Sequence, residues 1–217
     1  MSKVGVLLSG CGVYDGSEIH EAVITLLALD RAGAEIVCMA PDIDQMDVIN
    51  HLTGDAMPEK RNVLVESARI ARGEIKNLKD VKAADIDALI IPGGFGAAKN
   101  LSDFAVKGKD ARVNADVDRL LNEMITAKKA VGAICIAPAT LTRAIAEANP
   151  EVTIGNDPGT AEAIEAMGGT HRICSVDMIH VDEANKVVTT PAYMIGPGIA
   201  DVAAGIEKLV ARILELA

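Results

Sequence analysis

The chain has 217 residues and a formal net charge of −10, with 50% hydrophobic and only 2% aromatic residues. This length suits one domain with a full core, and the shortage of aromatic residues leaves Val, Ile, Leu, Ala and Met to build it, as in parallel sheets covered by helices. The acidic balance, without a Lys/Arg cluster, excludes the electrostatic surface that binds nucleic acid or anionic membranes.

Short apolar runs bounded by turn residues alternate with longer amphipathic stretches, which is the pattern of repeated βαβ units. In chain order, the sequence predicts strand 4–8, helix 18–31, strand 35–39, helix 58–71, strand 88–91, helix 114–128, strand 130–134, helix 136–148, short strand 152–154, helix 160–167, short strand 178–181, strand 187–190 and helix 199–216. Ser17 is the expected cap of the first helix. Segment 50–73 is less regular and is predicted to be an insertion near the carboxyl edge of the sheet.

No linker or repeat interrupts this pattern, so residues 1–217 are predicted to form a single domain. The first strand-like run is too short for a signal peptide, and no apolar run approaches the length of a membrane span. The four cysteines lie far apart without a C-x-x-C pair, which argues against disulfides and zinc. We therefore expect a cytoplasmic protein with no metal, no cofactor, no membrane contact and no nucleic-acid partner.

Cys135 lies where a buried apolar strand passes into a helix with an early proline, Pro138. A nucleophile elbow needs small residues two positions to either side of the nucleophile, and Ala133 and Ala137 occupy those positions. A thiol at a helix N-terminus is favoured as thiolate by the helix dipole. The alternative is a small buried core cysteine, which is a common place for this residue.

Two further features fit a reactive Cys135. Gly93 and Gly94 follow another apolar strand, where their backbone N–H groups can form an oxyanion hole, although a glycine pair is also ordinary in loops. Glu21 lies in the first turn of the first helix, where a carboxylate either compensates the dipole or serves as an acidic partner for the thiol once burial raises its pKa. Nucleophile and oxyanion donors are expected at neighbouring strand ends.

These motifs together resemble the ThiJ/PfpI superfamily, whose domain is similar to class I glutamine amidotransferases. The runs Ser9 to Glu21 and Asn50 to Gly54 more closely resemble the bacterial ElbB family, also called enhancing-lycopene-biosynthesis or amidotransferase-like isoprenoid proteins. The resemblance extends through nearly the whole chain. It implies a flavodoxin-like three-layer α/β/α sandwich with a mostly parallel sheet, which forms a homodimer.

The resemblance also implies a site and an activity. Cys135 would be the nucleophile, Glu21 its acidic partner, and the backbone of Gly93, Gly94 and Ile136 the oxyanion hole. The implied activity is a cofactor-independent glyoxalase reaction on a small dicarbonyl substrate, glyoxal to glycolate. Members of the superfamily are also described as protein deglycases.

The chain departs from the superfamily pattern at the third catalytic position. Many members carry a histidine directly after the nucleophile or in a later loop, whereas this chain has Ile136 and an Asn-Asp-Pro-Gly run that contains Asp157. Asp157 either replaces the histidine or belongs to a turn. His20 adjoins Glu21, but helix neighbours diverge by about 100°, so both are not expected to face Cys135. Cys11, in the loop after the first strand, either lines the pocket or is a packed small residue.

Three functions therefore remain open. The first is a glyoxalase-type enzyme, in which Glu21 moves a proton through an enediol while Cys135 holds the carbon skeleton. The second is a non-catalytic redox-sensing or regulatory domain, since an exposed thiol of low pKa oxidises readily. The third is a glutamine amidotransferase, whose Cys-His-Glu triad lacks its histidine here.

Overall fold

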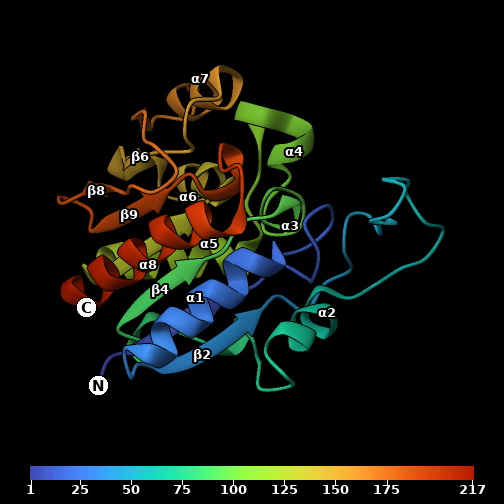
Figure 1. The fold of residues 1–217 in the computed structure, drawn as a ribbon, viewed down its shortest axis with the longest axis horizontal. Coiled ribbons are helices and arrows are strands. Elements are labelled where there is room, and N and C mark those ends of the chain that lie inside the picture. Colours follow the sequence, from blue (N-terminus) through green and yellow to red (C-terminus); the bar gives the residue numbers. More distant parts are fainter.

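A computed structural model describes residues 1–217, and its centre is a seven-stranded sheet between two layers of helices (Figure 1). The strand order is β3-β2-β1-β4-β5-β9-β8, and every neighbouring pair is parallel except β8 and β9. The strands are β1 (Lys3–Leu7), β2 (Glu35–Ala40), β3 (Lys76–Asn77), β4 (Ala88–Ile91), β5 (Ala130–Ile134), β8 (His180–Asp182) and β9 (Val187–Thr190). A separate parallel pair consists of β6 (Glu151–Val152) and β7 (Thr170–His171).

Helices cover both faces of this sheet. The helices are α1 (Ile19–Arg31), α2 (Val63–Ile70), α3 (Phe95–Lys99), α4 (Phe104–Lys107), α5 (Ala115–Thr126), α6 (Ala137–Ala144), α7 (Pro158–Ala166) and α8 (Ile199–Leu216). Side chains of α1, α2 and α8 share one apolar cluster, and those of α3 to α7 share the other. This arrangement confirms the predicted flavodoxin-like three-layer sandwich with a mostly parallel sheet.

The central strands supply both layers because successive side chains of a strand point to opposite faces. Along β4, Leu89 and Ile91 belong to the cluster under α5 and α6, whereas Ala88 and Ile90 belong to the cluster under α1 and α8. All four side chains are completely buried. A strand buried on both faces reads as an unbroken apolar run, which is why β4 was predictable with its correct bounds.

Five of the six predicted helices have different limits in the structure, and three of them show the cause. The helix predicted over 58–71 begins only at Val63, where the side chain of Asn62 accepts a hydrogen bond from the Val65 N–H. The helix predicted over 136–148 ends at Ala144 and continues as a 3₁₀ turn to an Asn149 in the left-handed region. The helix predicted over 160–167 begins two residues earlier, at Pro158. Local caps set these limits, as is usual for helix ends.

Four short elements were not predicted, namely α3, α4, β3 and β7. Each has five residues or fewer, so none carries enough of an apolar period to be recognised in the sequence. The helix α3 matters most for function, because it follows directly after the glycine pair at the end of β4.

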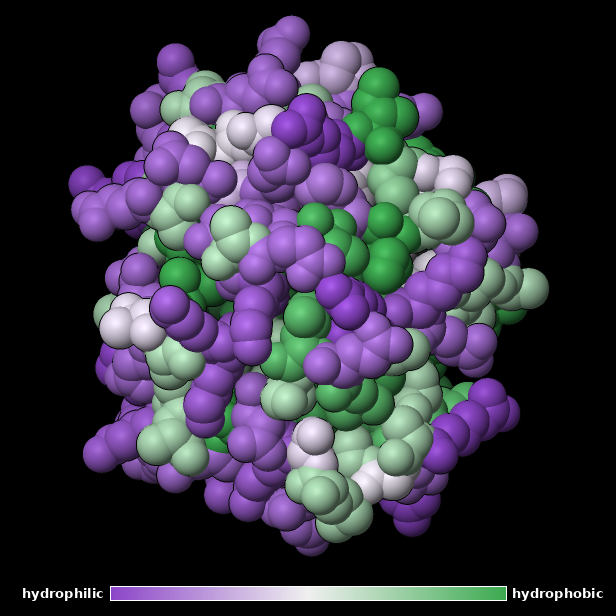
Figure 2. All heavy atoms as spheres, turned by 90° about the vertical axis from the view of Figure 1, so that its left-hand side faces the viewer, coloured by the Kyte–Doolittle hydropathy of each residue, from purple (hydrophilic) through white to green (hydrophobic).

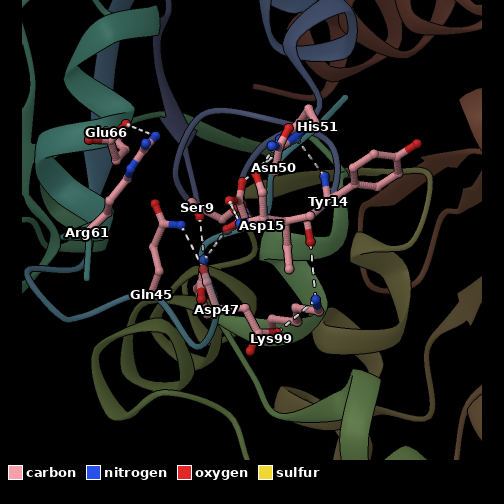
Figure 3. A network of polar contacts seen from close by, with 12 residues as sticks. Ser9, Tyr14, Asp15, Gln45, Asp47, Asn50, His51, Arg61, Glu66 and Lys99 are labelled. Atoms are coloured by element: carbon pink, nitrogen blue, oxygen red, sulfur yellow. Dashed lines mark hydrogen bonds and ion pairs between the residues drawn. The ribbon is translucent and has the colours of Figure 1, made fainter. Parts of the chain in front are cut away.

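Residues 41–62, which we call the arm, project from the carboxyl edge of the sheet between β2 and α2 (Figure 1). The arm begins and ends earlier in the sequence than the insertion predicted over 50–73, because it starts at the end of β2 and stops where α2 begins. Figure 3 shows how its base is attached: the buried carboxylate of Asp15 accepts the Ile49 N–H at 2.7 Å, and Lys99 pairs with Asp47 at 3.0 Å. The base of the arm is thus fixed to the loop after β1 through Asp15 and to α3 through Lys99.

Figure 2 shows the side of the molecule that carries both chain ends in Figure 1, and from which β2 and β4 point away. Hydrophilic residues cover most of this side, with apolar residues in groups between them. None of the helices combines the length and the apolar character that crossing a bilayer requires. The candidate site lies at the opposite end of the sheet, where the parallel strands finish.

Candidate active site at the carboxyl edge of the sheet

Cys135 occupies a tight turn between β5 and α6. Its φ of 63° lies in the left-handed region, which is uncommon for a residue with a side chain. Its N–H still donates to the Thr190 carbonyl of the neighbouring strand at 3.0 Å, so the turn begins within the sheet. The small neighbours Ala133 and Ala137 are completely buried, which lets strand and helix approach closely. The thiol is 8% exposed at this nucleophile elbow.

Glu21, in the first turn of α1, lies against this thiol. Its carboxyl group lies beside the Cys135 side chain, because a Cβ atom placed on Gly93 would meet both Cys135 and Glu21 Oε2, and Oε2 accepts the Gly93 N–H at 2.8 Å. The other oxygen, Oε1, accepts the Tyr193 N–H at 3.4 Å. The side chain is completely buried. Four segments distant in the sequence, those after β4, β5 and β9 and the start of α1, therefore meet at one carboxyl group.

Gly93 is required at its position because no other residue leaves room for this contact. A Cβ atom there would overlap the Cβ of Cys135, and it would lie 2.7 Å from Glu21 Oε2 and 2.8 Å from the Ile134 carbonyl oxygen. Gly94 has a φ of 92°, a conformation that residues with side chains rarely adopt. The glycine pair therefore permits the backbone to pass between the nucleophile and its acidic partner.

Burial dominates the electrostatics of the pair. Burial and the nearby charge of Glu18 raise the pKa of Glu21 to about 8, although the N–H groups of Gly93 and Tyr193 and the Cys135 thiol act in the opposite direction. Burial and the charge of Glu21 also raise the pKa of the Cys135 thiol well above its ordinary value. The expectation of a thiolate favoured by the helix dipole is therefore wrong, because desolvation outweighs the backbone donors.

The backbone N–H groups expected to form the oxyanion hole have two different roles in the structure. The N–H groups of Gly94 and Ile136 lower the pKa of the Cys135 thiol, which indicates that both face the point where a reacting carbon would attach. The Gly93 N–H, in contrast, is already taken by Glu21. Its expected role as an oxyanion donor is thereby corrected to that of holding the carboxyl group.

Two expected pocket residues have other surroundings. Asp157 is exposed and caps α7, where its carboxylate accepts the Thr160 N–H at 2.8 Å, so turn and cap chemistry explain it. Burial raises the pKa of the Cys11 thiol, and the charges that affect this pKa most are those of Glu66 and then Arg69 of α2. Cys11 is therefore on the α2 side of the loop, and neither residue is hydrogen-bonded to Cys135.

The start of α1 differs from the sequence expectation. Its cap is Glu18, whose carboxylate accepts the Glu21 N–H at 2.7 Å. Ser17, the expected cap, instead accepts the Ser9 N–H at 2.9 Å through its hydroxyl group. This exchange matters for the site because it places a second carboxylate, that of Glu18, beside the Glu21 carboxyl group.

Tyr193 is a site residue that sequence reasoning missed. Its hydroxyl group lies 2.7 Å from Nδ1 of His20, while its backbone N–H reaches Glu21. Tyr193 follows β9, and no local motif connects it with α1, which precedes it by more than 160 residues in the sequence. No group of three His, Cys, Asp or Glu side chains in the structure is arranged to hold a metal ion.

A parallel α/β sandwich with a cysteine at the turn after a central strand defines an amidotransferase-like fold. Within this class, the model of the DJ-1/PfpI family matches residues 11–171 of the chain. The chain therefore belongs to the DJ-1/PfpI family, as its resemblance to the ThiJ/PfpI superfamily predicted.

Similar proteins match over the whole chain. The rat protein named "ES1 protein homolog, mitochondrial" is 51% identical and covers 99% of this chain and 84% of its own length. The human "Glutamine amidotransferase-like class 1 domain-containing protein 3, mitochondrial" is 50% identical, covering 99% of this chain and 83% of its own. The crystal structure of an isoprenoid biosynthesis protein with amidotransferase-like domain from Ehrlichia chaffeensis is 35% identical, with a TM-score of 0.94 over 100% of this chain and 99% of that one.

These relatives correct one expectation from the sequence. The expected cytoplasmic location is wrong by this comparison, because the rat and human relatives are both named as mitochondrial proteins. The expectation rested on a short first strand, a lack of apolar runs and unpaired cysteines. Those features indicate a reducing environment, which more than one compartment of a cell provides, so they could not decide the location.

Proposed function

We propose that this protein is a cofactor-independent glyoxalase-type enzyme that converts glyoxal, or a similar small dicarbonyl, into a hydroxy acid. The observation that carries the proposal is the completely buried Glu21 carboxyl group beside the Cys135 side chain, where burial raises its pKa to about 8. A general acid and base works best when its pKa lies near the operating pH. The pair thus combines a nucleophile with a group that can both take up and return a proton.

The first step joins the nucleophile to the substrate. The Cys135 sulfur forms a bond to one aldehyde carbon of glyoxal while ionised Glu21 takes the thiol proton. The carbonyl oxygen becomes an oxyanion, which the N–H groups of Gly94 and Ile136 can then hold instead of the sulfur. Return of the proton to this oxygen completes a hemithioacetal, and the elbow needs no thiolate in its resting state.

The later steps move hydrogen between the two carbons. Glu21 removes the proton from the carbon bound to sulfur, which gives an enediol, and a proton is then delivered to the second carbon. The product of this shift is the thioester of glycolate on Cys135. One water hydrolyses the thioester, so that glyoxal and water give glycolic acid and the free thiol. One carbon is oxidised and the other reduced, and no external redox partner is needed.

The direct test is formation of glycolate from glyoxal, followed by NMR, with wild-type protein and the Cys135→Ala variant. We expect the variant to lose turnover by about a thousandfold or more, because no nucleophile remains. We also expect the wild-type rate to rise with pH through about 8, since only ionised Glu21 can accept the thiol proton. A folded Cys135→Ala variant with full activity, or disappearance of glyoxal without glycolate, would refute the proposal.

A glutamine amidotransferase is the weaker alternative. The name of the human relative and the fold favour it, but amide hydrolysis of this type uses a histidine beside the thiol. The histidine that comes near the site, His20, is hydrogen-bonded to Tyr193 and not to Cys135. Release of ammonia from glutamine is the assay that separates this function from the glyoxalase reaction. Redox sensing has less support, because the thiol is nearly buried and its pKa is raised.

A further inference from the structure

Tyr193 contacts the start of α1 at two points. Its backbone N–H donates to Glu21 Oε1 at 3.4 Å, and its hydroxyl group lies 2.7 Å from Nδ1 of the adjacent residue, His20. The two rings lie 5.8 Å apart at a tilt of 48°. Because His20 and Glu21 diverge around the helix, one residue can reach both only by using its backbone for one and its side chain for the other.

The backbone around Tyr193 is shaped for this contact. A 3₁₀ turn from Ala192 to Met194 follows β9 directly, and Ala192 has a φ of 43°, in the left-handed region. The preceding residue in the strand, Thr190, accepts the Cys135 N–H at 3.0 Å through its carbonyl. The segment that carries Tyr193 therefore borders the nucleophile on one side and its acidic partner on the other. A strained residue in such a place is typical of a functional site.

We propose that Tyr193, held in place by His20, is a positioning residue that fixes the Glu21 carboxyl group against the Cys135 thiol. The sequence has no histidine beside the nucleophile. His20 instead acts on the site indirectly, through Tyr193. The inference rests on the proposed function only in taking Cys135 as the nucleophile. It concerns the state of the thiol, and it holds whichever substrate the thiol attacks.

The groups around the Glu21 carboxyl group determine how loss of the Tyr193 contact changes the pKa of Glu21. Those that face its carboxyl group are Glu18 from α1, the Cys135 thiol and the backbone of Gly93 and Tyr193. The Tyr193 N–H lowers the pKa of Glu21, since it binds the charged form better than the neutral form. Without it, Glu21 holds its proton to higher pH, so the thiol loses its base near neutrality. The pH dependence of thiol reactivity should therefore move upward.

Alkylation of Cys135 by iodoacetamide, measured from pH 6 to 10 on the Cys135 peptide, tests this directly. We expect Tyr193→Phe and His20→Ala each to shift the midpoint of the rate profile upward by about half a pKa unit, which slows alkylation about threefold on the rising limb. His20→Gln keeps a hydrogen-bonding partner for the hydroxyl group and should restore the wild-type profile. Tyr14→Phe is the matched control, because no hydrogen bond involves the Tyr14 hydroxyl group in the structure, and its profile should not move.

The double variant His20→Ala/Tyr193→Phe distinguishes positioning of the Glu21 carboxyl group from simple shielding of the Cys135 thiol. If the two residues act as one unit, the double variant has the profile of either single variant. Faster alkylation at every pH with an unchanged midpoint would mean that Tyr193 only shields the thiol, and fully additive shifts would mean independent roles; either result overturns the inference. Iodoacetamide needs no dicarbonyl chemistry, so absence of glycolate formation with an intact shift would refute the proposed function alone.

Discussion

Replacing Glu21 with glutamine should remove a strong pH dependence from the stability of this protein. The pKa of Glu21 is raised from 4.5 to about 8 in the folded protein, mainly by burial. A carboxyl group of raised pKa stabilises the folded state at low pH, and this contribution is lost as the pH rises through the folded-state pKa. Between pH 4.5 and about 8, the wild-type free energy of unfolding should therefore fall, relative to that of the variant, by about 1.4 kcal/mol per pH unit.

Denaturant unfolding at pH 5, 6, 7 and 8 measures this difference, which should accumulate to an order of 4 kcal/mol in favour of Glu21→Gln. Glutamine has the shape of the neutral acid and can still accept the Gly93 N–H, so the variant should lose only about 1 kcal/mol at pH 5. Cys135→Ala is the control, because it keeps the buried carboxyl group and should retain a falling curve. Parallel curves for wild-type protein and Glu21→Gln would mean that Glu21 is already ionised at pH 5.

Replacing Gly93 with alanine should damage both the stability and the site. The added Cβ would overlap Cys135, and it would displace the Glu21 carboxyl group that the Gly93 N–H holds. Overpacking of this kind costs about 1–3 kcal/mol. Displacement of a catalytic group by as little as about 1 Å can lower a rate roughly a hundredfold. We therefore expect a less stable protein in which glycolate formation at Cys135 is slower by roughly a hundredfold.

Gly159→Ala is the matched control for this change. Gly159 lies within α7, and the nearest atom to an added Cβ there is Asp157 Oδ2 at 3.8 Å. Alanine in a helix is more favourable than glycine by about 0.5–1 kcal/mol, so this variant should be as stable as the wild type or slightly more stable. Denaturant unfolding and glycolate formation should be measured on both. Normal stability and activity in Gly93→Ala would show that the turn can move without cost.

The sequence was sufficient for the strands in the middle of the sheet, because β4, β5 and β9 are buried on both faces and appear as short apolar runs with clear ends. It was also sufficient for the turn at Cys135, whose small neighbours are needed for steric reasons. It failed at helix limits and short elements, where a single cap decides the outcome. The start of α1 is the example, since Glu18 and not Ser17 caps it.

The site was only partly predictable because its geometry depends on contacts between distant segments. The glycine pair was recognised, but nothing local shows that the Gly93 N–H binds Glu21 while the Gly94 N–H faces the sulfur. The sign of the thiol pKa shift was wrong for the same reason, since burial is a property of the whole fold. The contact of Tyr193 with His20 joins the two ends of the chain, and no spacing rule predicts it.

In the proposed reaction, Cys135 bonds to a dicarbonyl carbon and Glu21 then carries the hydrogen between the two carbons. Mass spectrometry of the Glu21→Gln variant after long exposure to glyoxal at pH 10 tests this step most directly, because the thiol can ionise there without Glu21 and add slowly, whereas the later proton transfer still lacks its base. We expect a peptide containing Cys135 heavier by the mass of one glyoxal, with no glycolate in solution. Adducts confined to other cysteines or to lysines and arginines, with Cys135 unmodified, would contradict it.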